Sequence, residues 1–196
     1  PYTIFEIGSI TKSFTGSLLA DIVRRGEVKL DDPLRKYLPE TVKLPKDGDR
    51  EITLLDLATH RSGLPRLPGN MSAADPDDPY VDYTDGQLYE FLAAVKLARP
   101  IGEAYEYSNL GMGLLGHALS RVAKTDYDTL VRQRVATPLG MKNTSTKVDP
   151  AANLHVAQGY EEADGKLAPA KPWTWRTSSS LTGAGGLRSS AREMVR

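Results

Sequence analysis

Apolar residues recur every three or four positions over much of the chain, and this spacing is typical of helices with one buried face. The clearest run starts after Gly8 and predicts a long helix over 9–25; it comprises Ile10, Phe14, Leu18, Leu19, Ile22 and Val23. Similar stripes and capping residues predict further helices at about 33–38, 54–61, 84–95, 109–122 and 127–136. The chain must therefore fold around packed helices.

Local signals indicate where several of these helices begin. Asp32 before Pro33 is typical of an N-cap followed by the first helical residue. Thr53 with Asp56 and Thr84 with Gln87 have the spacing of capping boxes. We therefore expect the short helices after Asp32, Thr53 and Thr84 to be set mainly by their own sequence.

The remaining segments lack a helical period. Four prolines and an acidic run indicate a long loop over 65–84. Extended segments at Val156–Tyr160 and Lys166–Pro169 flank the turn signal Ala163-Asp164-Gly165 and predict a small hairpin. The small, glycine-containing stretch 178–186 predicts an irregular loop that crosses closely over another backbone or lines a site. A capping box at 190–193 predicts the start of a last helix, and the sequence ends within this helix at 196.

Composition narrows the class of partner. The 25 basic and 25 acidic residues leave no net charge to attract nucleic acid, so a small-molecule or peptide substrate is expected. The chain has no cysteine, which excludes disulfides and thiolate chemistry. Its apolar runs are far shorter than the roughly 20 residues that a membrane-spanning helix needs, so no membrane span is expected. The chain opens at Pro1 without a targeting segment, which suggests processing or truncation.

Ser9 and Lys12 lie one turn apart at the start of the first predicted helix, within reach of each other. A serine hydroxyl becomes a strong nucleophile when a neighbour accepts its proton, and burial near a helix N-terminus prepares a lysine for this role by lowering its pKa. The spacing alone also fits a capped helix with a solvated lysine, because Ser-x-x-Lys is a short motif.

Tyr107-Ser108-Asn109 precedes another predicted helix and places a phenol beside a side-chain amide. Tyr107 could exchange protons and Asn109 could bind a substrate amide; the alternative is a helix cap with a packed tyrosine. The three histidines, His60, His117 and His155, are scattered without paired carboxylates, so packing or surface roles are expected and neither a metal nor another cofactor.

Several segments together resemble the serine β-lactamase and penicillin-binding-protein family, class C branch. In order along the chain they are 5–15 (FEIGSITKSFT), 52–65 (ITLLDLATHRSGLP), 107–111 (YSNLG), 138–141 (PLGM), 184–187 (AGGL) and 189–194 (SSAREM). Their order and context make the resemblance specific. It implies an α+β fold of the β-lactamase/transpeptidase type, of which this chain holds mainly the helical region, a small hairpin and little of the central antiparallel sheet.

The resemblance also implies a domain organisation and a mechanism. Residues 1–196 are one partial domain: nucleophile helix 9–25, helical region 33–137, hairpin and loop region 138–189, and truncated helix 190–196. Ser9 would attack a carbonyl and form an acyl-enzyme, Lys12 or Tyr107 would take its proton, and Asn109 would contact the substrate amide. A periplasmic or secreted location is expected from the family.

Substrate and activity stay open at this point. A β-lactam ranks narrowly first, followed by D-Ala-D-Ala peptides, D-amino-acid amides and esters, because pocket shape decides among them. The family's third motif is missing after the last predicted helix, and Lys124-Thr125-Asp126 lacks its glycine. A non-catalytic truncated fragment is therefore the rival hypothesis, and a homo-oligomer or second chain covering the face of the missing sheet is a third.

Overall fold

The computed structural model describes residues 2–147, 155–163, 165–175 and 180–196. Within this part of the chain the α-helices are α1 (Thr11–Arg24), α2 (Leu54–Ala58), α3 (Asp85–Ala94), α4 (Asn109–Ala123), α5 (Tyr127–Val131) and α6 (Ala191–Met194). Shorter helical turns are η1 (Gly8–Ile10), η2 (Leu34–Tyr37), η5 (Thr182–Ala184), all 3-10, and the π-helical η3 (Arg132–Ala136). The strands are β1 (Ile4–Glu6), β2 (Tyr160–Ala163), β3 (Lys166–Pro169) and β4 (Arg188–Ser190).

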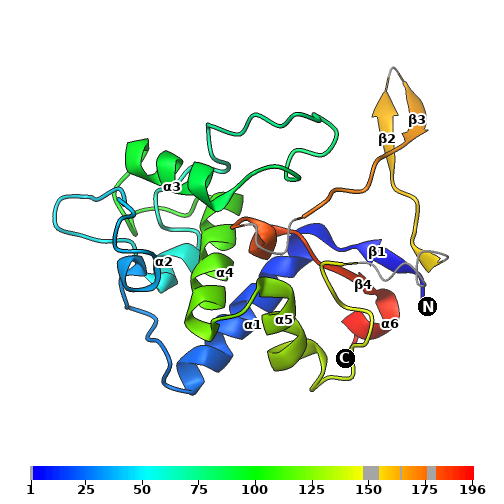
Figure 1. Cartoon of the computed structure of the whole chain (residues 1–196), viewed down its shortest axis with the longest axis horizontal. Helices are drawn as coiled ribbons and strands as arrows, with labels where there is room; N and C mark the ends of the chain where they lie inside the picture. The colour runs from blue at the N-terminus through cyan, green and yellow to red at the C-terminus, as the bar shows by residue number, and fades with distance from the viewer. Residues whose placement is uncertain (1, 148–154, 164, 176–179) are drawn as a thin grey trace.

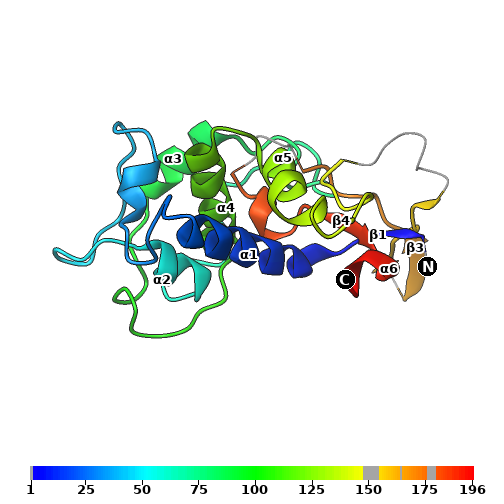
Figure 2. The ribbon, with the colours of Figure 1, turned by 90° about the horizontal axis from the view of Figure 1, so that it is seen from below.

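The helices α1 to α5 gather on one side, and the strands lie with α6 on the other (Figure 1). β1 pairs antiparallel with β4, with Phe5 opposite Ser189, and β2 pairs with β3 as a hairpin that projects from the body. α1 follows β1 through the turn η1 and runs roughly parallel to the long axis of the molecule (Figure 2). The start of α1 therefore lies where the helical part meets the short strands.

The core forms where α1, α4 and α5 pack against one another. Their inward residues have no exposed surface and belong to one apolar cluster; they include Leu18, Ile22, Leu114, Leu115, Leu119 and Leu130. Each fully buried leucine or isoleucine contributes about 1.5–3 kcal/mol of transfer free energy. This packing fixes α1 and α4, the two helices whose first turns carry the predicted site residues.

The loop that contains η5 crosses directly over α4. A methyl group on Gly113 would lie 2.7 Å from the Cα of Leu181, and one on Gly116 would lie 3.0 Å from the Cα of Gly183. Only glycine allows two backbones to approach this closely. This confirms, for residues 180–186, the prediction of a loop that crosses over another backbone; residues 178 and 179 lie outside the described part.

Buried threonines of α1 hold the same loop from the other side. Thr15 Oγ1 donates to the carbonyl of Gly183 at 2.7 Å, and Thr11 Oγ1 accepts from the N–H of Leu187 at 3.1 Å. Because a hydroxyl has one proton, the 2.6 Å contact between Thr15 and the buried Tyr127 hydroxyl is then donated by Tyr127. α1, α5 and the η5 loop are thus joined by one hydrogen-bonded chain.

Most predicted helices are confirmed, and the differences have local causes. The first α-helix begins at Thr11, because Gly8 (φ +49°) turns the chain into the 3-10 turn η1 that contains Ser9. Thr53 and Thr84 form the predicted capping boxes. The helix predicted over 127–136 is present as α5 continued by η3, and 65–84 contains no helix or strand.

Three predictions were wrong in detail. Pro33 is extended and is followed by 3-10 helix rather than α-helix, because the Asp32 carboxylate accepts from Lys29 N–H, Lys36 and Tyr37 instead of capping a helix. The first strand of the hairpin is Tyr160–Ala163 rather than 156–160, because Ala163 pairs with Lys166. Asp164 of the predicted turn lies outside the described residues.

The last helix has its Ser190 cap, but the Glu193 carboxylate binds Asn143 and Thr144 instead of completing the capping box.

Candidate active site

The side chains of Ser9, Lys12 and Tyr107 meet at the amino-terminal end of α1. Lys12 Nζ donates to Ser9 Oγ at 3.1 Å, and Tyr107 Oη donates to the same oxygen at 2.6 Å. Ser9 and Tyr107 can exchange donor and acceptor roles, because each carries a hydroxyl proton and lone pairs. The structure therefore brings together the three residues that the sequence assigned to catalysis, from segments nearly one hundred residues apart.

The Lys12 ammonium is partly buried. Its Nζ donates to the carbonyl of Ala184 in η5 at 2.6 Å and lies 4.8 Å from the centre of the Tyr107 ring. Burial lowers the pKa of Lys12 below its usual value and the Arg66 guanidinium adds to this, although the hydrogen bond and charge of Tyr107 oppose it. The neutral amine is thus more accessible than in a lysine exposed to water.

Tyr107 is placed by the cap of α4. Ser108 is the N-cap: its Oγ accepts from the N–H of Gly111 at 2.8 Å and donates to the carbonyl of Pro65 at 2.7 Å. Burial alone would raise the pKa of Tyr107, but hydrogen bonds with Lys12 and Ser9 and the charges of Lys12 and Arg66 outweigh it and lower the pKa. Lys12 and Tyr107 therefore form a coupled pair that can pass one proton.

Asn109 is the first residue of α4, and its side chain lines the same hollow as Ser9. Its Oδ1 is buried and has no hydrogen-bond partner among the described residues. A buried amide oxygen without a partner is costly unless a bound molecule or water satisfies it. The Asn109 amide is thus free to bind a substrate amide beside Ser9.

The hollow next to Ser9 has a volume of about 310 Å³ and an aromatic wall. Tyr80 stacks on Trp175 with ring centres 4.0 Å apart and lies 5.2 Å from Trp173. The other residues that line the hollow include Glu6, Gly8, Asn109, Glu161, Lys171, Ala184 and Gly185. Trp175 is buried and also lines the hollow.

Sequence reasoning missed three contributors to the site. Arg66 lies 5.4 Å from the Tyr107 ring centre and directly follows a recognised motif. Tyr80 falls in the irregular loop, where no periodic signal exists. The Ala184 carbonyl, which accepts from Lys12, lies 172 residues further along the chain, and only the folded backbone shows that contact.

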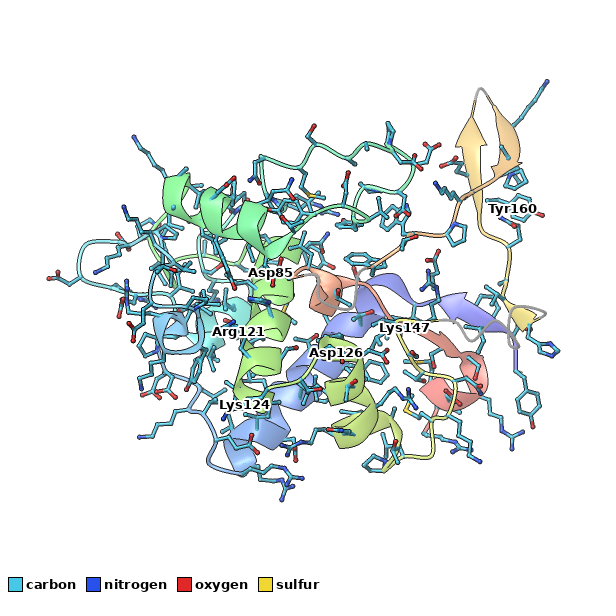
Figure 3. All side chains as sticks on the ribbon, viewed as in Figure 1. Asp85, Arg121, Lys124, Asp126, Lys147 and Tyr160 are labelled. Carbon is cyan, nitrogen blue, oxygen red and sulfur yellow. The ribbon has the colours of Figure 1, made fainter. Side chains whose placement is uncertain are left out.

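A second cavity, of about 410 Å³, lies away from Ser9 between α4 and the starts of α3 and α5 (Figure 3). Its charged lining residues are Asp85, Arg121, Lys124 and Asp126, labelled in Figure 3. Ser120 donates to the carbonyl of Gly116 at 2.9 Å, and His117 bonds Tyr89 at 2.7 Å, so neither is paired as a nucleophile and base. The serine that contacts both an amine and a phenol is Ser9, in the first hollow.

In the part of the chain that the structure describes, no group of three or more histidine, aspartate or glutamate side chains is arranged to hold a metal ion. None of the helices in this part combines the length and apolarity needed to cross a bilayer.

Ser9, Lys12 and Tyr107 thus form a serine-centred cluster at the start of α1. The family model described as Beta-lactamase matches residues 1–196, and the chain belongs to this family. The chain is 34% identical over 197 residues to the D-alanyl-D-alanine-carboxypeptidase/endopeptidase AmpH of Escherichia coli K12, covering 99% of this chain and 48% of that protein. It is 32% identical to a β-lactamase of the same organism, covering 99% and 46%.

Solved structures show the same relationship. A β-lactamase/D-alanine carboxypeptidase from Yersinia pestis, complexed with citrate, superposes with a TM-score of 0.84 at 32% identity, covering 98% of this chain and 52% of that one. A class C β-lactamase from Rhodobacter sphaeroides gives a TM-score of 0.77 at 30% identity, covering 100% and 50%. The resemblance and the fold class expected from the sequence are confirmed: the chain is mainly the helical region of the β-lactamase/transpeptidase fold. It spans about half the length of the curated relatives it matches.

Proposed function

We propose that the chain carries the nucleophile of a serine hydrolase that forms an acyl-enzyme on Ser9. One observation carries the proposal: Ser9 Oγ lies 3.1 Å from Lys12 Nζ and 2.6 Å from Tyr107 Oη. A hydroxyl that touches both a partly buried amine and a phenol of lowered pKa has an immediate route for its proton. The alternative, in which Ser9 only caps a helix and Lys12 is solvated, does not account for the partial burial of Lys12 against the Ala184 carbonyl.

The reaction proceeds in two acyl transfers. Ser9 Oγ forms a bond to the substrate carbonyl carbon while its proton passes to the Lys12–Tyr107 pair. The tetrahedral intermediate then expels the amine or alkoxide, which receives that proton. A water molecule gives its proton to the same pair as its oxygen attacks the acyl carbon, and Ser9 Oγ leaves and is reprotonated. The positive end of α1 favours the negative oxygen of both intermediates.

The substrate class is a carbonyl compound with an amide that Asn109 can bind. The free Asn109 oxygen and the aromatic hollow of about 310 Å³ favour an acylamino group beside the scissile carbonyl, a feature shared by β-lactams and D-Ala-D-Ala peptides. A β-lactam ranks narrowly first. A D-Ala-D-Ala carboxypeptidase is the second candidate, because both AmpH and the Yersinia pestis protein carry that activity in their names.

Turnover measurements test the proposal and rank the substrates. The purified chain is assayed with a chromogenic cephalosporin, a D-Ala-D-Ala peptide and a p-nitrophenyl ester, beside Ser9→Ala and the control Ser13→Ala, whose side chain is exposed on α1. We expect activity in the wild type and in Ser13→Ala and none in Ser9→Ala. Turnover that survives in Ser9→Ala would overturn the mechanism, and no turnover or adduct with any substrate would favour the non-catalytic fragment.

A further inference from the structure

His60 lies just after α2 in an unusual backbone conformation. Its φ of +58° is left-handed, a region that glycine or asparagine normally occupies at a helix end. Its N–H donates to the carbonyl of Leu57 at 3.2 Å, which closes the last turn. A histidine held in this conformation indicates that its side chain is used.

The imidazole and the backbone of His60 hydrogen-bond to the two residues on either side of Tyr107 in the sequence. His60 Nδ1 accepts from the N–H of Ser108 at 3.1 Å, and the His60 carbonyl accepts from the N–H of Glu106 at 2.8 Å. The two residues that flank Tyr107 in sequence are therefore both bonded to His60. The imidazole also packs against the Tyr107 ring, with centres 4.8 Å apart and planes 31° apart, and meets the edge of Tyr105 at 5.6 Å.

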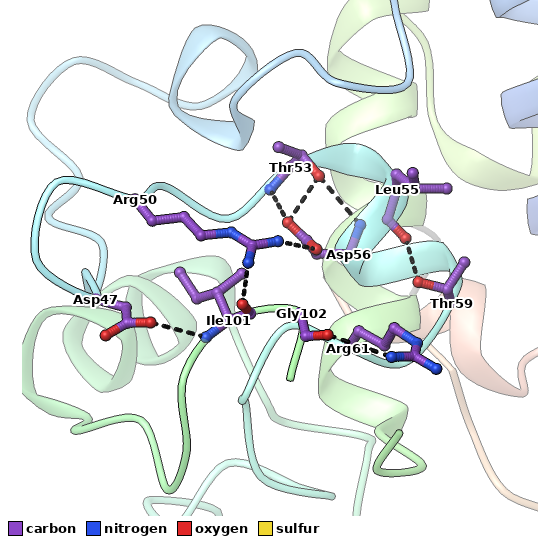
Figure 4. Close-up of polar contacts among 9 residues, drawn as sticks. All are labelled: Asp47, Arg50, Thr53, Leu55, Asp56, Thr59, Arg61, Ile101 and Gly102. Carbon is purple, nitrogen blue, oxygen red and sulfur yellow. Dashed lines mark hydrogen bonds and ion pairs between the residues drawn. The ribbon is translucent and has the colours of Figure 1, made fainter. Parts of the chain in front are cut away.

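The segment that carries His60 is itself rigidly attached to the segment that leads to Tyr107. Arg61 Nη1 donates to the carbonyl of Gly102 at 3.2 Å, and the N–H of Gly102 donates to the carbonyl of Arg61 at 2.7 Å. Figure 4 shows the side-chain contacts of this junction, which involve Asp47, Arg50, Thr53, Asp56, Arg61, Ile101 and Gly102. These contacts between the two segments do not involve the imidazole, which makes the separate contact with the Tyr107 ring.

The bond to Ser108 fixes the protonation state of His60. A ring nitrogen that accepts an N–H must carry a lone pair, so His60 is neutral with its proton on Nε2. Protonation would set Nδ1–H against the Ser108 N–H, two donors facing each other. The bond from Ser108 to the imidazole would then be lost, and the Tyr107 segment would be held to His60 only by the bond from Glu106 N–H to the His60 carbonyl.

We propose that neutral His60 is a positioning residue that holds Tyr107 in contact with Ser9, and that its protonation releases Tyr107 and lowers acylation at acid pH. The inference rests on the proposed function of Ser9, but not on any particular substrate. His60 does not touch Ser9, so it acts through Tyr107.

The charges around His60 favour its neutral form. Facing it are Lys12 from α1 and Tyr107 and Tyr105 from the segment before α4, with Arg66 beyond Tyr107. The Glu106 carboxylate forms an ion pair with Arg99 at 2.9 Å. Burial, followed by the charge of Lys12, lowers the pKa of His60. The acid loss of activity is therefore expected below the ordinary histidine value of about 6.5.

Two substitutions separate the acceptor from the ring. His60→Asn keeps an oxygen that can accept from Ser108 and tolerates the left-handed backbone, but it does not titrate. His60→Phe keeps a ring against Tyr107 and leaves the Ser108 N–H unpaired. His155→Gln is the matched control, since His155 is exposed and belongs to neither segment.

The acylation rate at saturating substrate and its pH profile are measured from pH 4.5 to 8.5 for all four proteins. We expect His60→Asn to keep most of the rate at pH 7.5 but to lose the acid fall that the wild type and His155→Gln show. We expect His60→Phe to acylate about 10- to 100-fold more slowly with little change in KM. An acid fall of unchanged midpoint in His60→Asn, or a wild-type rate in His60→Phe, would overturn the inference.

An NMR titration keeps the test independent of folding defects and of turnover. In the unmodified chain, the imidazole nitrogens of His60 and the ring carbons of Tyr107 are followed over the same pH range. We expect an unprotonated Nδ1 at pH 7.5 and a Tyr107 shift that follows the His60 titration. A protonated Nδ1 at pH 7.5, or a Tyr107 signal indifferent to His60, would reject the inference, whereas a lack of Ser9 acylation in the wild type would reject only the proposed function.

Discussion

Removing the hydroxyl of Tyr107 separates the chemistry of the site from its packing. Tyr107→Phe deletes one oxygen, 2.6 Å from Ser9 Oγ, and keeps the ring that packs on His60 and lies near Lys12. A positioned acid–base group contributes roughly 10²- to 10⁴-fold to a rate, which corresponds to about 3–5 kcal/mol of activation free energy. The same hydroxyl contributes only about 1 kcal/mol to the free energy of unfolding, because water replaces its bond when the chain unfolds. Acylation should therefore fall at least about 100-fold.

The assay follows single-turnover acylation by intact-protein mass spectrometry and, in parallel, thermal unfolding. The melting temperature should change by no more than about 2–4 °C, the effect of about 1 kcal/mol in a domain of this size. Tyr105→Phe is the control, because Tyr105 is two residues away and largely exposed. A loss smaller than about tenfold in Tyr107→Phe would refute a proton-transfer role and leave Lys12 as the base.

Three further predictions address the neighbours of Ser9, the backbone crossing and acid stability. Lys12→Met should slow acylation on the order of 100-fold. It should also raise the pKa of Tyr107, measured by ultraviolet titration, because Lys12 helps to lower that pKa. An unchanged Tyr107 pKa would contradict the coupling between Lys12 and Tyr107. Gly116→Ala should lower the free energy of unfolding, measured in urea, by about 1–3 kcal/mol, because the added methyl group would meet Gly183 and Tyr127. The control Gly16→Ala on α1, which has open space around it, should be neutral or slightly stabilising. Equal effects of the two substitutions would refute the close crossing of the η5 loop over α4. Hydrogen bonds from Lys36, then Tyr37 and the Lys29 N–H, hold the pKa of Asp32 well below its usual range. The ionised carboxylate therefore stabilises the fold above about pH 4, and this contribution disappears as the pH falls. The urea midpoints of the wild type and Asp32→Asn should converge below that pH, and a difference that stays constant would contradict this role of Asp32.

The elements that the sequence predicted well are those whose causes are local. The Thr53 and Thr84 caps lie within one turn of the groups they bind, so spacing alone identified them. Asp32-Pro33 failed because the Asp32 carboxylate had other donors within five residues, and a capping pattern does not show such competition. The sequence showed that the η5 loop would be unusual, but the fold alone reveals that it places the Ala184 carbonyl on Lys12.

The candidate site shows the same division. Ser9, Lys12, Tyr107 and Asn109 were named from motifs in the correct order, and the structure brings the first three into contact. Their catalytic roles remain predictions. His60 was assigned to packing or surface because a lone histidine carries no pattern, and its role depends on a backbone N–H that lies 48 residues away. Arg66 and Tyr80 escaped notice for a similar reason: their effect is electrostatic or aromatic and arises only where segments meet.

Mapping the covalent adduct tests the central claim most directly. The chain is mixed with a β-lactam, quenched within seconds to minutes, digested, and its peptides are sequenced by mass spectrometry. With a penicillin we expect a mass increase equal to the whole molecule on Ser9, because ring opening releases no fragment, and no such increase in Ser9→Ala. An adduct on another residue, or one that persists in Ser9→Ala, would contradict it.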